Sequence, residues 1–81
     1  MTVDLVHQQP EGVDSSRVTR WLKAEGDTVA AGEPLLEVEA DKAEIEVTSP
    51  YDGTLVEIAA DVGDELFDGD LLAVFDTGGD A

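Results

Sequence analysis

Residues 37–47, EVEADKAEIEV, read almost as a mirror image about Asp41 and Lys42. Small or apolar residues alternate with glutamates on both sides of this centre, which is the period-two pattern of a β-strand. Two such runs separated by two residues predict a tight antiparallel hairpin. One face of it should carry Leu36, Val38, Ala40, Ile45 and Val47, and the other face should carry Glu37, Glu39, Glu44 and Glu46.

The chain also repeats itself. A shift of 37 positions places Gly26 on Gly63 and Gly32 on Gly69. Because glycine is the residue best suited to turns with positive φ, matched glycines predict matched turns. Apolar positions coincide under the same shift: Val18 with Leu55, Trp21 with Ile58, Val29 with Leu66, Leu35 with Leu72, and Val38 with Phe75. We therefore predict an all-β fold, a flattened barrel or sandwich of two four-stranded antiparallel sheets with internal pseudo-twofold symmetry (a barrel-sandwich hybrid).

Short strands and turns follow from the same patterns. Strands are expected over residues 3–6, 17–23, 35–40, 43–48, 55–59 and 71–75, a loop over 7–16, and turns at 26–27, 31–34, 49–53, 63–64 and 69–70. Alternation does not fully assign Trp21, Leu22, Val56 or Ile58 to a face, so a bulge is expected in each of these two segments. Trp21 should cover one flank of the core, and His7 should be an ordinary loop residue.

A single domain is expected over residues 1–76, with 77–81 as a flexible tail or the start of a linker. The symmetric copy of the hairpin tip falls at 78–79. Lys42 and the two chain ends should therefore lie at opposite ends of the molecule.

Composition excludes several classes of function. The chain of 81 residues has no cysteine and one histidine, so a thiolate metal site, a thiol nucleophile or a histidine-based triad lacks its residues, and no metal site is expected. The formal charge of −16 disfavours nucleic acid and anionic membranes. That charge suits a basic partner, and it is equally compatible with a generally solvated acidic surface or a salt-loving host. With no signal-like start and no apolar span, a cytoplasmic, monomeric domain is expected.

Lys42 is the candidate functional residue. Its neighbours Ala40 and Ala43 are small, so nothing near the tip would bury the amine as a catalytic lysine requires. An exposed lysine on a turn is accessible to a modifying enzyme. It could also be a charge that protects an exposed hairpin from edge pairing. The other lysine, Lys23, precedes a turn and is expected to be solvated.

The residues around Lys42 resemble a known family. Asp41-Lys42-Ala43 matches the attachment tip of the lipoyl domains found in the dihydrolipoamide acyltransferase components of 2-oxo acid dehydrogenase complexes. That family carries glycines sixteen residues before the lysine and eleven after it, which are Gly26 and Gly53 here. The likeness covers about residues 11–76. Ala40 replaces the usual Thr or Ser, and the first loop lacks its usual glycines, so the identity of the complex is left open.

The resemblance implies a non-catalytic carrier with lipoic acid attached covalently to Lys42. Asp41 and Ala43 would be recognised together with the tip, although for Asp41 the favoured role is in the turn, where it would accept local backbone N–H groups. Glu39 and Glu44 are candidates for partner contact, and Gly26 and Gly53 for structural turns. The implied partners are a lipoate ligase or lipoyl transferase, a thiamine-diphosphate-dependent 2-oxo acid dehydrogenase, an acyltransferase core and dihydrolipoamide dehydrogenase.

Two alternatives remain at this stage. Biotin carrier domains share the fold, but they display their lysine between methionines, and the one methionine here is Met1. An unmodified acidic interaction module is the other alternative. The 2-oxo acid, and whether the domain stands alone or begins a longer acyltransferase, are left open.

Overall fold

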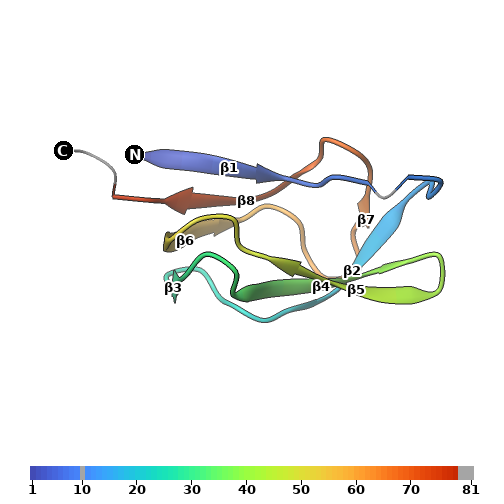
Figure 1. Cartoon of the computed structure of the whole chain (residues 1–81), viewed down its shortest axis with the longest axis horizontal. Helices are drawn as coiled ribbons and strands as arrows, with labels where there is room; N and C mark the ends of the chain where they lie inside the picture. The colour runs from blue at the N-terminus through green and yellow to red at the C-terminus, as the bar shows by residue number, and fades with distance from the viewer. Residues whose placement is uncertain (10, 79–81) are drawn as a thin grey trace.

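The computed structural model describes residues 1–9 and 11–78. That part of the chain forms eight strands and no helix (Figure 1). The strands are β1 (Thr2–Val6), β2 (Ser16–Trp21), β3 (Thr28–Val29), β4 (Pro34–Ala40), β5 (Ala43–Thr48), β6 (Gly53–Ile58), β7 (Glu65–Leu66) and β8 (Leu71–Asp76).

The strands form two antiparallel four-stranded sheets in the orders β1-β8-β6-β3 and β5-β4-β2-β7. The sheets stack into an elongated sandwich of 42 × 20 × 19 Å. Each sheet keeps its own edge strands, so the described strands do not close into a barrel. The prediction of two four-stranded sheets is confirmed. The strands β3 and β7 were not predicted individually, because two residues are too short to show alternation.

The predicted hairpin forms in the expected register. Ala40 pairs with Ala43, Glu39 with Glu44, Val38 with Ile45, Glu37 with Glu46, and Leu36 with Val47. Two residues, Asp41 and Lys42, make the turn. Because β5 is an edge strand, Ile45 remains 37% exposed although it lies on the apolar face.

The pseudo-twofold symmetry is visible in the backbone. The φ angles are 94° at Gly26 and Gly63, and 90° and 89° at Gly32 and Gly69. The N–H of Gly26 donates to the carbonyl of Leu55 (2.7 Å), and the N–H of Gly63 donates to the carbonyl of Val18 (2.8 Å). The symmetry exchanges β1 with β5, β2 with β6, β3 with β7 and β4 with β8, so it exchanges the two sheets.

Bulges interrupt β2 and β6 at equivalent places. The register shifts between Val18 and Arg20 and again between Leu55 and Glu57. These shifts explain why alternation alone did not assign faces there. A third shift lies between Pro34 and Leu36 on β4, and it allows two consecutive residues of that strand to be buried.

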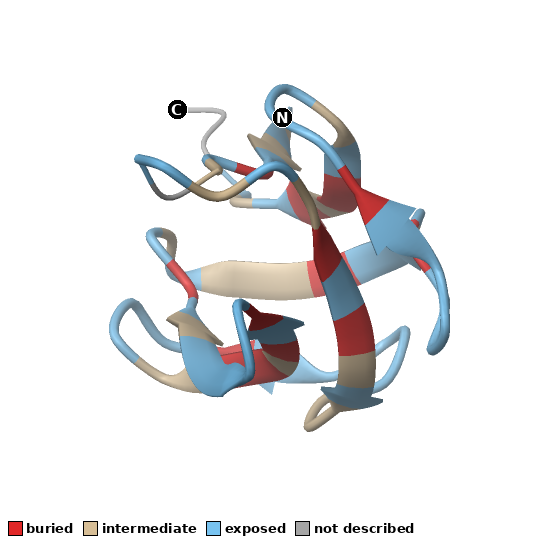
Figure 2. Cartoon of the chain, turned by 90° about the vertical axis from the view of Figure 1, so that its right-hand side faces the viewer, coloured by how far each residue is buried: buried red, intermediate tan, exposed pale blue. Residues whose placement is uncertain are grey.

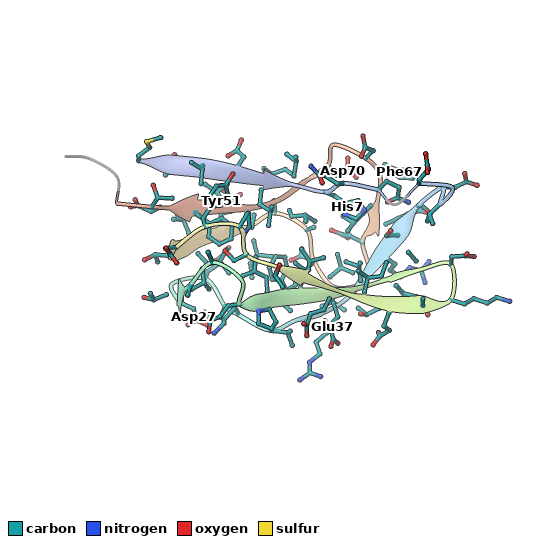
Figure 3. All side chains as sticks on the ribbon, in the orientation of Figure 1. His7, Asp27, Glu37, Tyr51, Phe67 and Asp70 are labelled. Carbon is teal, nitrogen blue, oxygen red and sulfur yellow. The ribbon has the colours of Figure 1, made fainter. Side chains whose placement is uncertain are left out.

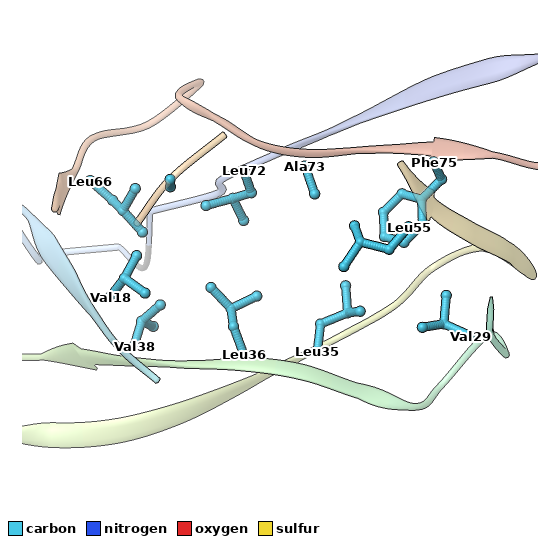
Figure 4. Close-up of a cluster of buried hydrophobic side chains, with 11 residues drawn as sticks. Val18, Val29, Leu35, Leu36, Val38, Leu55, Leu66, Leu72, Ala73 and Phe75 are labelled. Carbon is cyan, nitrogen blue, oxygen red and sulfur yellow. The ribbon is translucent and has the colours of Figure 1, made fainter. Parts of the chain in front are cut away.

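The core lies between the sheets, where the inward-facing strand segments are buried (Figure 2). In Figure 4, Leu72, Ala73 and Phe75 of β8 face Leu35, Leu36 and Val38 of β4. The cluster consists of Val18, Val29, Leu35, Leu36, Val38, Leu55, Ala60, Leu66, Leu72, Ala73 and Phe75. Trp21 packs against its flank and donates its indole N–H to the carbonyl of Ala60 (2.7 Å).

His7 lies in a loop as expected, but it is not an ordinary loop residue. Its side chain is 5% exposed, and its ring Nε2 lies 2.6 Å from Gln9 Oε1. Its backbone N–H donates to the carbonyl of Asp70, and its carbonyl accepts from Gly69. Ser49 occupies the equivalent place in the other half, with its N–H on the carbonyl of Glu33. The backbone hydrogen bonds of His7 thus close a turn of the second half and hold His7 in its buried position.

The first residues of β1 pair with the last residues of β8, at the opposite end of the molecule from the hairpin tip (Figure 1). The N–H of Thr77 donates to the carbonyl of Met1 (2.9 Å), and the N–H of Gly78 donates to Asp76 Oδ1 (2.9 Å). Residues 79–81 of the expected tail, and with them half of the symmetric copy of the tip, lie outside the described residues.

Candidate functional site

Lys42 lies at the extreme tip of the β4–β5 hairpin and is exposed. The φ angles are 52° at Asp41 and 66° at Lys42, the two positive values that a type I′ turn requires. Among the described residues no other non-glycine has positive φ. Aspartate tolerates this conformation better than most residues, whereas lysine has no such preference. The tip therefore holds its lysine at a cost in backbone energy.

The two lysines are in different electrostatic settings. Lys23 Nζ lies 3.2 Å from Glu33 Oε2. The N–H of Ala30 and the Lys23 ammonium together hold the pKa of Glu33 below its ordinary value. The ion pairs of the described residues are this one and Met1 with Asp76, so Lys42 takes part in neither. Lys42 is thus the lysine whose amine is presented outward.

The side chains next to the lysine leave room around it. Ala43 follows it on β5 and is exposed, while Ala40 is buried beneath the turn. The Asp41 carboxylate makes no hydrogen bond within residues 1–9 and 11–78. The expectation that Asp41 accepts local backbone N–H groups is therefore wrong, and its contribution to the turn is its backbone conformation. Lys42 has the features that an amide-linked group requires: an exposed primary amine, small neighbours and no ion pair.

The first loop lies beside the tip. A shallow polar hollow next to Lys42 is lined by Ser15, Ser16, Arg17, Glu39, Asp41 and Glu65. The loop is held in place by Gln9, whose Oε1 accepts from the Ser16 hydroxyl (3.1 Å) and whose N–H donates to Asp68 Oδ1 (3.0 Å). Ser15 in turn donates to Glu65 Oε2 (2.8 Å). The loop and β7 therefore share one end of the molecule with Lys42.

The acidic ladder behind the tip faces two arginines. Glu39 is paired with Glu44 on one side and with Arg17 on the other, and Glu37 lies between Glu46 and Arg20 in the same way. Arg17 and Arg20 are three residues apart, so a regular strand would place them on opposite faces. The bulge after Val18 brings both to the outer face. Cross-strand pairs of opposite charge offset the repulsion between glutamates. Sequence reasoning missed this role because alternation fails at a bulge.

Glu44 is further tied to β2. The hydroxyl of Thr19, the bulged residue, lies 3.2 Å from Glu44 Oε2 and 3.0 Å from the carbonyl oxygen of Glu37. Glu39 and Glu44 are both exposed, which leaves their outer sides open to a partner.

Gly26 and Gly53 meet different needs. Gly26 lies in a turn with φ of 94°. Gly53 lies not in the preceding turn but at the first position of β6. A Cβ atom there would lie 2.5 Å from the carbonyl oxygen of Asp76 on β8, so Gly53 allows two backbones to approach closely.

Other kinds of site find no support in residues 1–9 and 11–78. They contain no group of three or more His, Cys, Asp or Glu side chains arranged to hold a metal ion. No helix in this part of the chain is long and apolar enough to cross a membrane.

Comparison with known proteins agrees with this geometry. Residues 8–75 match the Biotin_lipoyl family, described as "Biotin-requiring enzyme". The dihydrolipoyllysine-residue acetyltransferase component of the pyruvate dehydrogenase complex of Corynebacterium glutamicum is 51% identical over 63 residues, covering 78% of this chain and 9% of that protein. The succinyltransferase component of the 2-oxoglutarate dehydrogenase complex of Bacillus subtilis is 36% identical over 73 residues, covering 90% and 18%. The chain thus spans less than a fifth of the length of these relatives.

Two solved structures share the fold. The lipoyl domain of the 2-oxoglutarate dehydrogenase complex of Azotobacter vinelandii superposes with a TM-score of 0.78 at 32% identity, over 95% of this chain and 99% of that one. Urea carboxylase of Kluyveromyces lactis superposes with a TM-score of 0.71 at 29% identity, over 86% of this chain and 7% of that one. The chain therefore belongs to the biotin/lipoyl attachment family, as a lipoyl domain.

Proposed function

We propose that this domain is the lipoyl carrier of a 2-oxo acid dehydrogenase complex and that Lys42 is its attachment residue. The observation that carries the proposal is the placement of Lys42, an exposed and unpaired amine at the tip of a hairpin, at the end of the molecule opposite Met1. The likeness to lipoyl domains and to acyltransferase components supports it.

Attachment requires a nucleophilic amine. Lys42 Nζ would attack the activated carboxyl carbon of lipoate, lose a proton and form an amide bond as the activating group leaves. The lysine loses its positive charge in this step. When bound, the lipoyl group supplies a disulfide that carries acyl groups and reducing equivalents.

The residues of this chain give that group a rigid support and leave free space around its attachment point. The paired strands β4 and β5 hold the tip rigidly away from the core. Ala43 and the exposed turn keep bulky side chains away from Lys42. The domain itself is proposed to be non-catalytic, because it acts by presenting its arm to other enzymes. Tethering of the arm raises the local concentration of its end at each of them.

The proposed partners are those of a complete complex: a lipoate ligase or lipoyl transferase, a thiamine-diphosphate-dependent 2-oxo acid dehydrogenase, an acyltransferase core and dihydrolipoamide dehydrogenase. The names of the relatives support the complex, since they include components of pyruvate and 2-oxoglutarate dehydrogenase complexes. A cytoplasmic location is part of the same proposal.

The test is intact mass spectrometry after incubation with a lipoate ligase, ATP and lipoate. Wild type and Lys23→Arg should each gain one lipoyl increment, while Lys42→Arg should gain none. A parallel incubation with a biotin ligase and biotin should leave the wild-type mass unchanged. A biotin increment in place of a lipoyl increment would support the biotin carrier reading, and no increment with either would support an unmodified module.

Glu39 and Glu44 are proposed to steer partners with basic entrances toward the tip. Steering of this kind raises association rates at low salt more than it raises affinity. Glu39→Gln/Glu44→Gln should therefore lower the rate of lipoylation at low salt, and the difference from wild type should shrink as salt is added. Equal rates for the two proteins at low salt would rule out this role.

A further inference from the structure

The pseudo-twofold symmetry provides an internal comparison of exposed side chains. Phe67 is 50% exposed, and the equivalent residue of the other half is Ala30. Leu71 is 38% exposed and corresponds to Pro34. The same contrast holds where Val6, 44% exposed, corresponds to Thr48. The backbone does not require large apolar side chains at these positions, since the other half does without them.

Val6, Phe67 and Leu71 are here called the Phe67 patch, and their backbones are linked through β1, β8 and the turn before β8. Val6 of β1 pairs directly with Leu71 of β8, and directly opposed residues of an antiparallel pair point to the same face. Phe67 belongs to the turn that leads into β8. Its N–H donates to Asp70 Oδ2 (2.8 Å), and its carbonyl accepts from the N–H of Asp70 (3.1 Å). Figure 3 shows Phe67, Asp70 and His7 together.

The surroundings of the patch are acidic. Glu65, Asp68 and Asp70 flank Phe67 in the sequence, and the first two are exposed. All four basic residues of the chain lie between positions 17 and 42, so neither residues 1–16 nor residues 43–81 contain a lysine or arginine. An apolar surface flanked by carboxylates, with Arg17 beside Glu65 as the nearby cation, fits a partner that combines apolar side chains with a rim of lysine or arginine.

The patch lies toward the functional end of the molecule. Glu65, two residues before Phe67, pairs with Arg17 on β2 and lines the hollow beside Lys42. Figure 3 places Phe67 on the side toward which the β4–β5 hairpin points. An enzyme whose entrance receives an arm attached to Lys42 can therefore also reach Phe67.

The Phe67 patch lies beside the tip and does not surround Lys42, and this position favours one class of partner. A lipoate-attaching enzyme must bring its active site to the Lys42 amine itself, so its contacts should surround the tip. An enzyme that acts on the far end of a long arm stands away from Lys42, and its contacts can fall on a surface beside the tip. We propose, resting on the function proposed above, that the Phe67 patch docks the 2-oxo acid dehydrogenase at an apolar surface with a basic rim near its active-site entrance.

The test is the rate of reductive acylation of the lipoylated domain. Pyruvate dehydrogenase and 2-oxoglutarate dehydrogenase are first compared on wild type, and the active one is used. Phe67→Ser should lower kcat/KM about tenfold, mainly through KM, because a half-exposed aromatic anchor is lost from the contact. Phe67→Leu should restore most of the rate. The rate at which the ligase lipoylates each variant, followed by intact mass spectrometry, should match that of wild type within about twofold.

Ala30→Phe is the matched control, since it places an aromatic residue at the symmetric turn far from Lys42. It should leave kcat/KM unchanged. Equal kcat/KM for Phe67→Ser and wild type would overturn the docking proposal while leaving the carrier function intact. A wild-type domain that is never lipoylated, or is lipoylated but acylated by neither dehydrogenase, would overturn the proposed function and the docking surface with it. Equal losses in lipoylation and acylation would show that the patch serves the tip or the fold and would likewise overturn the proposal.

Discussion

The backbone of Lys42 has a conformation in which a side chain is unfavourable. At a φ of 66° its Cβ is crowded by the neighbouring carbonyl, a cost that glycine does not have. A tight two-residue turn ordinarily uses Asn-Gly or a similar pair. Here Asp41-Lys42 stands in that position. The sequence has therefore kept a lysine where the turn alone would select glycine.

Lys42→Gly should make the domain more stable. Removing the strained side chain should raise the free energy of unfolding by about 1 kcal/mol, while abolishing any attachment at this position. Urea denaturation followed by tryptophan fluorescence measures the change, since Trp21 lies on the flank of the core. Lys23→Gly is the control. Lys23 does not have positive φ and loses its contact with Glu33, so this variant should be less stable than wild type. A loss of stability in Lys42→Gly would contradict the idea of strain at the tip.

At the scale of elements, four carboxylates hold the turns of the two halves. Asp27 Oδ2 accepts the N–H of Ala24, and Asp64 Oδ2 accepts that of Asp61, both at 2.9 Å. Glu33 Oε1 and Asp70 Oδ2 accept the N–H groups three residues before them, both at 2.8 Å. Part of the acidity of this chain is thus structural, because each of these side chains satisfies a backbone donor.

Glu33 should make stability depend on pH. The Ala30 N–H and then Lys23 hold its pKa below the ordinary value of 4.5. Its contribution is therefore fully present above that value and is lost as the pH falls through the lower pKa of the folded state. Glu33→Gln should have a lower melting temperature than wild type at neutral pH, and the two should converge once the pH is below the lowered pKa of folded Glu33. The repulsion among the other carboxylates is common to both proteins, so the pH dependence of their difference in melting temperature reports the titration of Glu33. A difference that stays constant with pH would contradict the prediction.

Elements with repeated signals could be predicted from the sequence. The hairpin register followed from alternation over eleven residues, and the symmetry followed from the spacing of Gly26, Gly32, Gly63 and Gly69. The two short strands could not be found, since two residues carry no period. The burial of His7 was missed because it depends on a turn more than sixty residues away. The arginines beside the acidic ladder were missed because a bulge reverses the face of Arg20.

At the scale of the whole molecule, charge is the dominant feature. The domain carries a formal charge of −16 on a sandwich 42 Å long and 20 Å wide. Only two ion pairs form among the described residues, so most carboxylates repel one another across solvent. Such self-repulsion lowers the stability of the compact state and is screened by salt over roughly 8 Å at physiological ionic strength.

Added sodium chloride should therefore stabilise the domain. The melting temperature should rise by several degrees between low salt and about 1 M, because the screening length falls to roughly 3 Å. Sucrose over the same concentrations is the uncharged comparison: it stabilises by exclusion from the protein surface and not by screening, so its effect should rise evenly with concentration. The steepest part of the rise should lie below about 0.3 M, where the screening length changes most. A melting temperature that is flat across this range would show that the repulsion is already relieved by the fold.

The pairing of Met1 with Thr77 makes the chain almost a ring. Thr77 donates to the Met1 carbonyl, and under the pseudo-twofold symmetry these two residues correspond to Ala40 and Ala43, the pair that flanks the hairpin turn. A two-residue bridge from Thr77 to Met1 would reproduce that turn and produce a cyclic backbone. A circular permutant opened elsewhere could then display an Asp-Lys tip at each end, so that one domain would carry two arms.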